Sequence, residues 1–115
     1  MDDKLSKALE FVNFSQTLAK QKQILKDRYE DNLVCFYQGK KFKATKELIA
    51  FCQVLKDKER EEVWLVDDNG IPIKIDDLDD FMDELLHCYF FASNEYFTEY
   101  SKLATERSIN GLLDE

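Results

Sequence analysis

The chain has 115 residues, of which 44% are hydrophobic and 35% charged, and its formal net charge is −8. This composition is typical of a folded soluble protein and excludes an intrinsically disordered chain, and the length suits a single domain with a modest core. No apolar run approaches the ~18 residues of a membrane span, and the N-terminus lacks the apolar stretch of a signal peptide, so we expect a cytoplasmic protein without a membrane partner.

The charges are divided unevenly along the chain. Residues 1–56 hold eleven Lys or Arg against seven Asp or Glu, whereas residues 57–115 hold five against seventeen. If the two halves separate in space, their opposite charges favour head-to-tail attraction or a basic partner for the acidic half. If the fold interleaves the halves, the asymmetry disappears, and the sequence leaves both arrangements open.

A long first helix is predicted over residues 3–31. Apolar side chains cover more than half of the helical wheel in its first half: Leu5, Ala8, Leu9, Phe11, Val12, Phe14, Leu18 and Ala19. A helix that faces one layer needs an apolar arc of only ~100° or slightly more, so an arc wider than ~180° indicates contact with more than one element. A partner chain is one candidate for the second contact.

Two β-hairpins and a short helix follow. Residues 33–44 hold two short β-rich runs around Gly39 and predict the first hairpin. Thr45 can cap a helix over residues 46–58. Residues 62–75 predict the second hairpin, with Asn69-Gly70 as a type I′ turn and with Pro72 at a sheet edge or a bulge. Because a two-stranded hairpin is marginal alone, we expect the two hairpins to join into one small antiparallel sheet.

A second long helix is predicted over residues 77–107, where apolar residues recur at helical spacing for about eight turns. They are Leu78, Met82, Leu85, Leu86, Tyr89, Ala92, Tyr96, Phe97, Tyr100, Leu103 and Ala104. At ~1.5 Å per residue such a helix spans roughly 45 Å, more than the ~35 Å diameter of a compact chain of this size. It either breaks near Ser93-Asn94 or belongs to an elongated molecule that uses it for association, which we favour.

The predicted fold is therefore α+β in a single domain: two long amphipathic helices and a shorter one packed on a small sheet from two hairpins.

An acidic cluster surrounds the start of the last helix. It comprises Asp67, Asp68, Asp76, Asp77, Asp79, Asp80, Asp83 and Glu84. One interpretation is a docking face for a basic protein or a mimic of nucleic-acid phosphates; the other is helix capping and solubility. Phe91 falls on the polar side of the helix beside His87, where an aromatic side chain indicates either a second layer of contacts or an isolated exposed ring.

The first hairpin interleaves aromatic residues with lysines, as single-strand nucleic-acid binders do. The residues are Phe36, Tyr37, Lys40, Lys41, Phe42, Lys43 and Lys46. A sequence pI near 4.7 and the absence of arginine from the hairpin argue against this interpretation. A half-buried strand produces the same alternation.

Catalytic and metal-binding patterns are scarce. Glu84-x-x-His87 has the spacing of di-iron bundles, but His87 is the only histidine, so it is more simply a surface side chain paired with Asp83. Cys35, Cys52 and Cys88 form no C-x-x-C pair and are expected to be buried, reduced thiols. We therefore expect no catalytic residues, no cofactor and no metal.

The leading functional hypothesis is a non-enzymatic, acidic interaction or regulatory module that forms a homodimer through its long helices. A nucleic-acid-associated factor that uses the first hairpin is the second hypothesis, and an enzyme or metal protein is the third.

Overall fold

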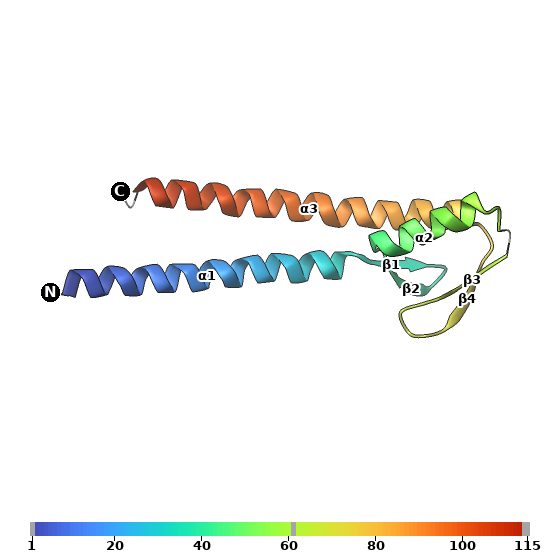
Figure 1. The fold of residues 1–115 in the computed structure, drawn as a ribbon, viewed down its shortest axis with the longest axis horizontal. Helices are drawn as coiled ribbons and strands as arrows, with labels where there is room; N and C mark the ends of the chain where they lie inside the picture. Colours follow the sequence, from blue (N-terminus) through green and yellow to red (C-terminus); the bar gives the residue numbers. More distant parts are fainter. Residues whose placement is uncertain (1, 61, 114–115) are drawn as a thin grey trace. The chain divides into compact units, whose positions relative to one another are not determined.

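The structure, a computed structural model, describes residues 2–60 and 62–113. Its elements in chain order are α1 (Asp2–Asn32), β1 (Val34–Tyr37), β2 (Lys40–Lys43), α2 (Lys46–Asp57), β3 (Val63–Val66), β4 (Pro72–Ile75) and α3 (Leu78–Leu113) (Figure 1). The predicted α+β fold class and the predicted order of elements are confirmed.

The chain divides into two compact units. The central unit consists of residues 29–95, and the terminal unit consists of the two ends of the chain, up to residue 28 and from residue 96. Every buried apolar residue found in the structure, from Leu33 to Ala92, belongs to the central unit. In the terminal unit, none of the described side chains is buried.

Phe81 lies at the centre of the core and has no exposed surface. Its ring meets the rings of Tyr37 and Phe42 edge-on, with centroids 5.0 and 4.9 Å away. The apolar stripe predicted for the last helix did not include Phe81. The first turns of α3 bury a wider arc of side chains than that stripe. The β1–β2 hairpin packs against Phe81, and Leu85 also lies in the same core.

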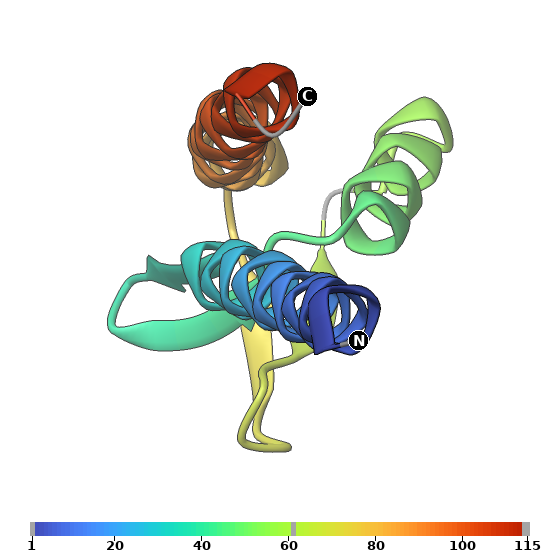
Figure 2. The same ribbon diagram turned by 90° about the vertical axis from the view of Figure 1, so that its left-hand side faces the viewer.

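The hairpins form two separate two-stranded antiparallel sheets, and Figure 2 shows them extending in different directions. The expectation of one joined sheet is wrong. A single backbone hydrogen bond, from the Asp68 N–H to the Lys41 carbonyl at 2.9 Å, links the two hairpins. Each hairpin turns alternate side chains into the common core, so the hairpins meet through side chains more than through their edges. These buried side chains are Cys35, Tyr37 and Phe42 from the first hairpin and Val63, Leu65 and Ile75 from the second.

One of the two hairpin turns differs from its prediction. Gln38 and Gly39 both have positive φ, 51° and 77°, so the first hairpin has the type I′ geometry. In the second hairpin Gly70 has φ 77° but Asn69 does not have positive φ, so the predicted type I′ turn is wrong there. The reason is the buried carboxylate of Asp67, whose Oδ1 accepts the N–H groups of Asn69 (2.9 Å) and Ile71 (2.8 Å) and holds a wider turn.

Pro72 lies in an edge strand, as predicted. Asp67 donates its N–H to the Ile71 carbonyl, which makes this pair hydrogen-bonded, so the next pair, Val66 and Pro72, is a non-hydrogen-bonded one. The nitrogen of Pro72 therefore faces away from β3, where its missing N–H removes nothing from the ladder.

We expect Gly39→Ala to destabilise the central unit by about 1 kcal/mol. An added Cβ at Gly39 would meet nothing within 4 Å, so the cost comes from the positive φ alone. Urea denaturation measures this change. Gly39→Asn is the control, because asparagine tolerates this conformation better than alanine and should cost less. Equal stability of the alanine variant and the wild type would contradict the assigned backbone strain.

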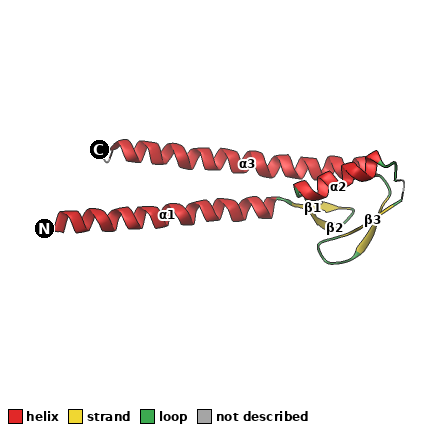
Figure 3. Ribbon diagram, viewed as in Figure 1, coloured by secondary structure: helices red, strands yellow, loops and turns green. Residues whose placement is uncertain are grey.

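Helix α3 is continuous from Leu78 to Leu113, and Figure 3 shows no interruption in it. The alternative of a break near Ser93-Asn94 is therefore wrong, and the helix extends six residues beyond the predicted end at 107. Of the helices the structure describes, none is both long enough and apolar enough to cross a membrane.

Candidate interaction surfaces

The first half of α1 exposes a set of large apolar side chains. Leu5, Leu9, Phe11, Val12 and Phe14 are between 40% and 70% exposed. On the helical wheel they form two stripes, one through Leu5, Leu9 and Val12 and one through Phe11 and Phe14. The wide apolar arc predicted from the sequence is thus present, but this chain leaves it largely uncovered.

The second segment of the terminal unit, in α3, has the same character. Phe97 is 73% exposed and Tyr100 is 41% exposed. The ammonium group of Lys22 lies 5.7 Å from the centre of the Tyr100 ring, and Tyr96 meets Tyr100 at 6.1 Å. A cation–π contact of this kind is worth about 0.5–1 kcal/mol at an exposed site, which is far less than a buried apolar core supplies.

The acidic cluster is partly occupied by local structural roles. Asp77 caps α3, because its Oδ1 accepts the Asp80 N–H at 3.0 Å. Asp80 in turn accepts the Tyr37 hydroxyl at 3.2 Å. Burial, followed by this bond to Asp80, raises the pKa of Tyr37. Asp67 is buried in the β3–β4 turn and is not available to a partner.

Cations from the same chain meet other members of the cluster. Lys56 forms an ion pair with Asp79 at 2.8 Å, and this hydrogen bond raises the pKa of Lys56. Asp76 lies 3.8 Å from Lys74. Asp76, Asp77 and Asp79 line a hollow of about 430 Å³ together with Lys56, Leu78, Glu59 and Arg60. Capping and internal neutralisation therefore account for much of this cluster.

One side of α3 remains open. Asp83, Glu84, His87 and Phe91 are all exposed there, and their positions on the helical wheel lie within about 100° of each other. Asp68 is exposed as well, at the tip of the second hairpin. These residues are the part of the predicted acidic face that is free to meet a basic partner. The pairing of His87 with Asp83 that the sequence suggested is not among the ion pairs of the described residues.

No metal centre forms in the part of the chain that the structure describes, because no three His, Cys, Asp or Glu side chains come together there. Glu84 and His87 stand on the exposed side of α3 without a third ligand.

The lysine- and aromatic-rich hairpin offers little surface to a nucleic acid. Tyr37 and Phe42 are buried in the core. Lys43 forms an ion pair with Glu30, and this pairing raises the pKa of Lys43. The accessible remainder consists of Phe36, Lys40, Lys46 and the half-buried Lys41. A single exposed ring cannot stack successive bases as single-strand binders do.

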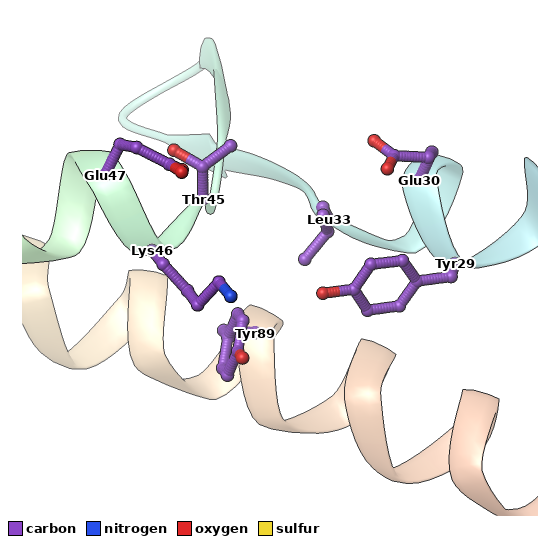
Figure 4. Close-up of a pocket in the computed structure, with 7 residues that line it drawn as sticks. All are labelled: Tyr29, Glu30, Leu33, Thr45, Lys46, Glu47 and Tyr89. Carbon is purple, nitrogen blue, oxygen red and sulfur yellow. The ribbon is translucent and has the colours of Figure 1, made fainter. Parts of the chain in front are cut away.

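A small pocket of about 270 Å³ lies in the central unit. Its lining residues are Tyr29, Glu30, Leu33, Thr45, Lys46, Glu47 and Tyr89. Figure 4 shows the Tyr29 ring extending into it from the end of α1. The volume is slightly below the ~300 Å³ at which ligand pockets begin, and the two glutamates oppose the charge of Lys46, so no ligand class stands out.

Three apolar side chains on the hairpins are exposed, and the sequence predicted a surface role for only one of them, Phe36. Phe36, Trp64 and Val66 are each more than 60% exposed. Both faces of β3 are apolar in sequence, since Val63 and Leu65 alternate with Trp64 and Val66. Periodicity therefore identifies the strand but not the face that packs on the core.

Comparison with protein-family models, with curated proteins and with solved structures finds no match to this chain.

Proposed function

We propose that this protein is a non-enzymatic, cytoplasmic interaction module that self-associates through the apolar surface of its terminal unit. The observation that carries this proposal is the exposure of Leu5, Leu9, Phe11, Val12 and Phe14 in a unit with no buried described side chain. Helices in water obtain most of their stability from packing of an apolar face. A second copy of the chain, which brings the same face, supplies that packing.

The exposed area supports a dimer. Eight large apolar side chains of the terminal unit are between 40% and 73% exposed: Leu5, Leu9, Phe11, Val12, Phe14, Ile24, Phe97 and Tyr100. With roughly 150–200 Å² for each side chain, they leave on the order of 600 Å² of apolar surface. A stable interface of standard size covers about 800 Å² per partner, so this surface is large enough to form the greater part of one.

The open side of α3 supports a second contact, with a basic protein. Asp83 and Glu84 lie on the same side of α3 as the exposed ring of Phe91, about two turns along the helix, so this side combines negative charge with an apolar anchor. This arrangement suits a partner surface that pairs lysine or arginine with an apolar group. Nucleic-acid binding by the first hairpin has less support, since two of its three aromatic residues are buried.

Self-association is tested by Val12→Glu, with Ser6→Glu as the matched control. Both variants add one carboxylate to exposed positions in the first half of α1, but their positions differ by about 120° around the helix. Ser6 lies in the polar gap between the two apolar stripes, about 60° from Leu9 and about 80° from Phe14. Glutamate forms helices better than valine, so Val12→Glu does not weaken the helix itself. Light scattering after size-exclusion chromatography and sedimentation equilibrium give the dissociation constant.

We expect Val12→Glu to weaken association at least tenfold, because each subunit then places an unpaired charge in an apolar interface. Ser6→Glu should stay within about twofold of the wild type. Circular dichroism should show equal helix content in both variants. A wild-type protein that remains monomeric at every concentration tested, or equal dissociation constants for the two variants, would overturn the proposal.

A further inference from the structure

Two of the three cysteines meet inside the central unit. Cys35 on β1 and Cys88 on α3 are 53 residues apart in sequence, yet their sulfur atoms lie 2.7 Å from each other. The Cys88 thiol donates to the sulfur of Cys35, whose own thiol lies 3.6 Å from the carbonyl oxygen of Glu84. The third cysteine, Cys52 on α2, is fully buried and forms no hydrogen bond to either sulfur.

The position of this pair follows from the fold. Cys35 points inward in the alternation of β1, between the exposed Phe36 and the half-buried Val34. Cys88 lies one turn after Glu84 on α3, and on the helical wheel it is close to the buried side chains of Phe81 and Leu85. The strand and the helix therefore bring the two thiols together without help from the terminal unit.

We propose that Cys35 and Cys88 are a redox-active dithiol that a hydroperoxide converts into an intramolecular disulfide between β1 and α3. The site takes a small peroxide as its co-substrate, and thiols such as glutathione return it to the reduced state. Both sulfurs already face each other, so the disulfide needs only a small approach to reach the ~2.05 Å of an S–S bond.

The two thiols have different roles because their surroundings differ. Cys35 is 3% exposed, and burial, followed by the closeness of the Cys88 sulfur and the nearby charge of Glu84, raises its pKa to about 12. Its thiol therefore stays protonated at neutral pH and is shielded from solvent. Cys88 is half-buried, so it is the thiol that a peroxide can reach. Because attack on a peroxide needs access to it, we assign the first step to Cys88.

The reaction balances with the hydroperoxide as the only oxidant. The Cys88 thiolate attacks one peroxide oxygen, the O–O bond breaks, and the products are a sulfenic acid on Cys88 and an alcohol or water. The sulfur of Cys35 then attacks the Cys88 sulfur, the S–O bond breaks, and the hydroxide leaves as water with the proton of Cys35. The two sulfurs lose two electrons in total, and the peroxide gains them.

A metal ion is a poor alternative occupant. Two thiols at one place resemble half of a zinc site, but no third His, Cys, Asp or Glu completes a ligand group in the described residues. The disulfide also has a structural consequence, since it closes a long loop and fixes α3 to the first hairpin. It does not depend on the proposed self-association, which uses the terminal unit.

The experiment exposes the full-length reduced protein to hydrogen peroxide and then counts free thiols in denaturant. We expect the count to fall from three to one, with a mass loss of two hydrogen atoms and a proteolytic fragment that links Cys35 to Cys88. Thermal unfolding of the central unit should shift upward by about 10 °C, and dithiothreitol should reverse both changes.

Two variants test which cysteines form the disulfide. Cys52→Ala should still form the disulfide, so its thiol count should fall from two to zero. Cys88→Ser keeps Cys35 and Cys52, and it should retain two free thiols and show no shift in thermal unfolding. A gain of oxygen atoms without the linked fragment, a disulfide between two chains, or linkage through Cys52 would each overturn the proposal.

Discussion

Phe81→Ala should lower the free energy of unfolding of the central unit by about 3–5 kcal/mol, the range for removal of a fully buried phenylalanine. The side chain has no exposed surface, and its ring meets Tyr37 and Phe42 edge-on. Removal of the ring leaves a cavity between α3 and the first hairpin and also breaks both aromatic contacts, each worth about 0.5–1.5 kcal/mol beyond the buried area.

Phe91→Ala is the matched control for this change. It removes the same atoms from the same helix, but Phe91 is 57% exposed, so its effect on stability should stay within about 0.5 kcal/mol. Trp64, the only tryptophan, belongs to the central unit, and its fluorescence during urea denaturation reports on that unit alone. Equal midpoints for the two variants would show that Phe81 does not hold the core together.

The order and type of the elements could be predicted from the sequence because each rests on local chemistry. The helical spacing in α1 and α3 and the cap at Thr45, whose hydroxyl accepts the Leu48 N–H at 3.1 Å, need only neighbouring residues. The positions of Gly39 and Pro72 are also local signals. These local features are enough to define the α+β class without any tertiary contact.

The structure differs from the sequence predictions where a distant or buried group competes with a local preference. The Asn69-Gly70 pair favours a type I′ turn, but the buried Asp67 carboxylate binds two N–H groups of the loop and imposes another turn. The hairpins do not join into one sheet, since their inward side chains share one core. Phe81 was overlooked because a wheel drawn over the whole helix averages away the wider buried arc of its first turns.

In the candidate surfaces, too, some features follow from neighbouring residues and others depend on contacts between distant ones. The excess of apolar positions in the first half of α1 is a local signal, and the exposure of these residues matches it. The roles of the acidic residues are not local: Asp80 meets Tyr37 from the first hairpin, and Asp79 meets Lys56 from α2. The Cys35–Cys88 pair also lacks a sequence signal, because 53 residues separate two cysteines that only the fold brings together.

The central unit should lose stability as the pH rises above 9. Burial raises the pKa of Cys52 from its ordinary value of 9.0 to about 11, and the pKa of Cys35 rises to about 12. In the unfolded chain both thiols release their protons near pH 9, whereas in the folded chain they keep them. The unfolded state therefore binds fewer protons between pH 9 and about 11, and an increase in pH favours unfolding.

The expected slope is about 1.4 kcal/mol per pH unit for each thiol in this window, and there should be little thiol-dependent change below pH 8. Urea denaturation at a series of pH values from 7 to 10, with a reductant present, measures it. Cys52→Ala should remove about 1.4 kcal/mol per unit from the slope above pH 9, whatever its effect on stability at neutral pH. The raised pKa of Tyr37 also lowers stability as the pH rises above 10, so the comparison of wild type with Cys52→Ala stops at pH 10. A wild-type stability that does not change from pH 8 to pH 10 would mean that the thiols of the core are not shielded from water in the folded protein.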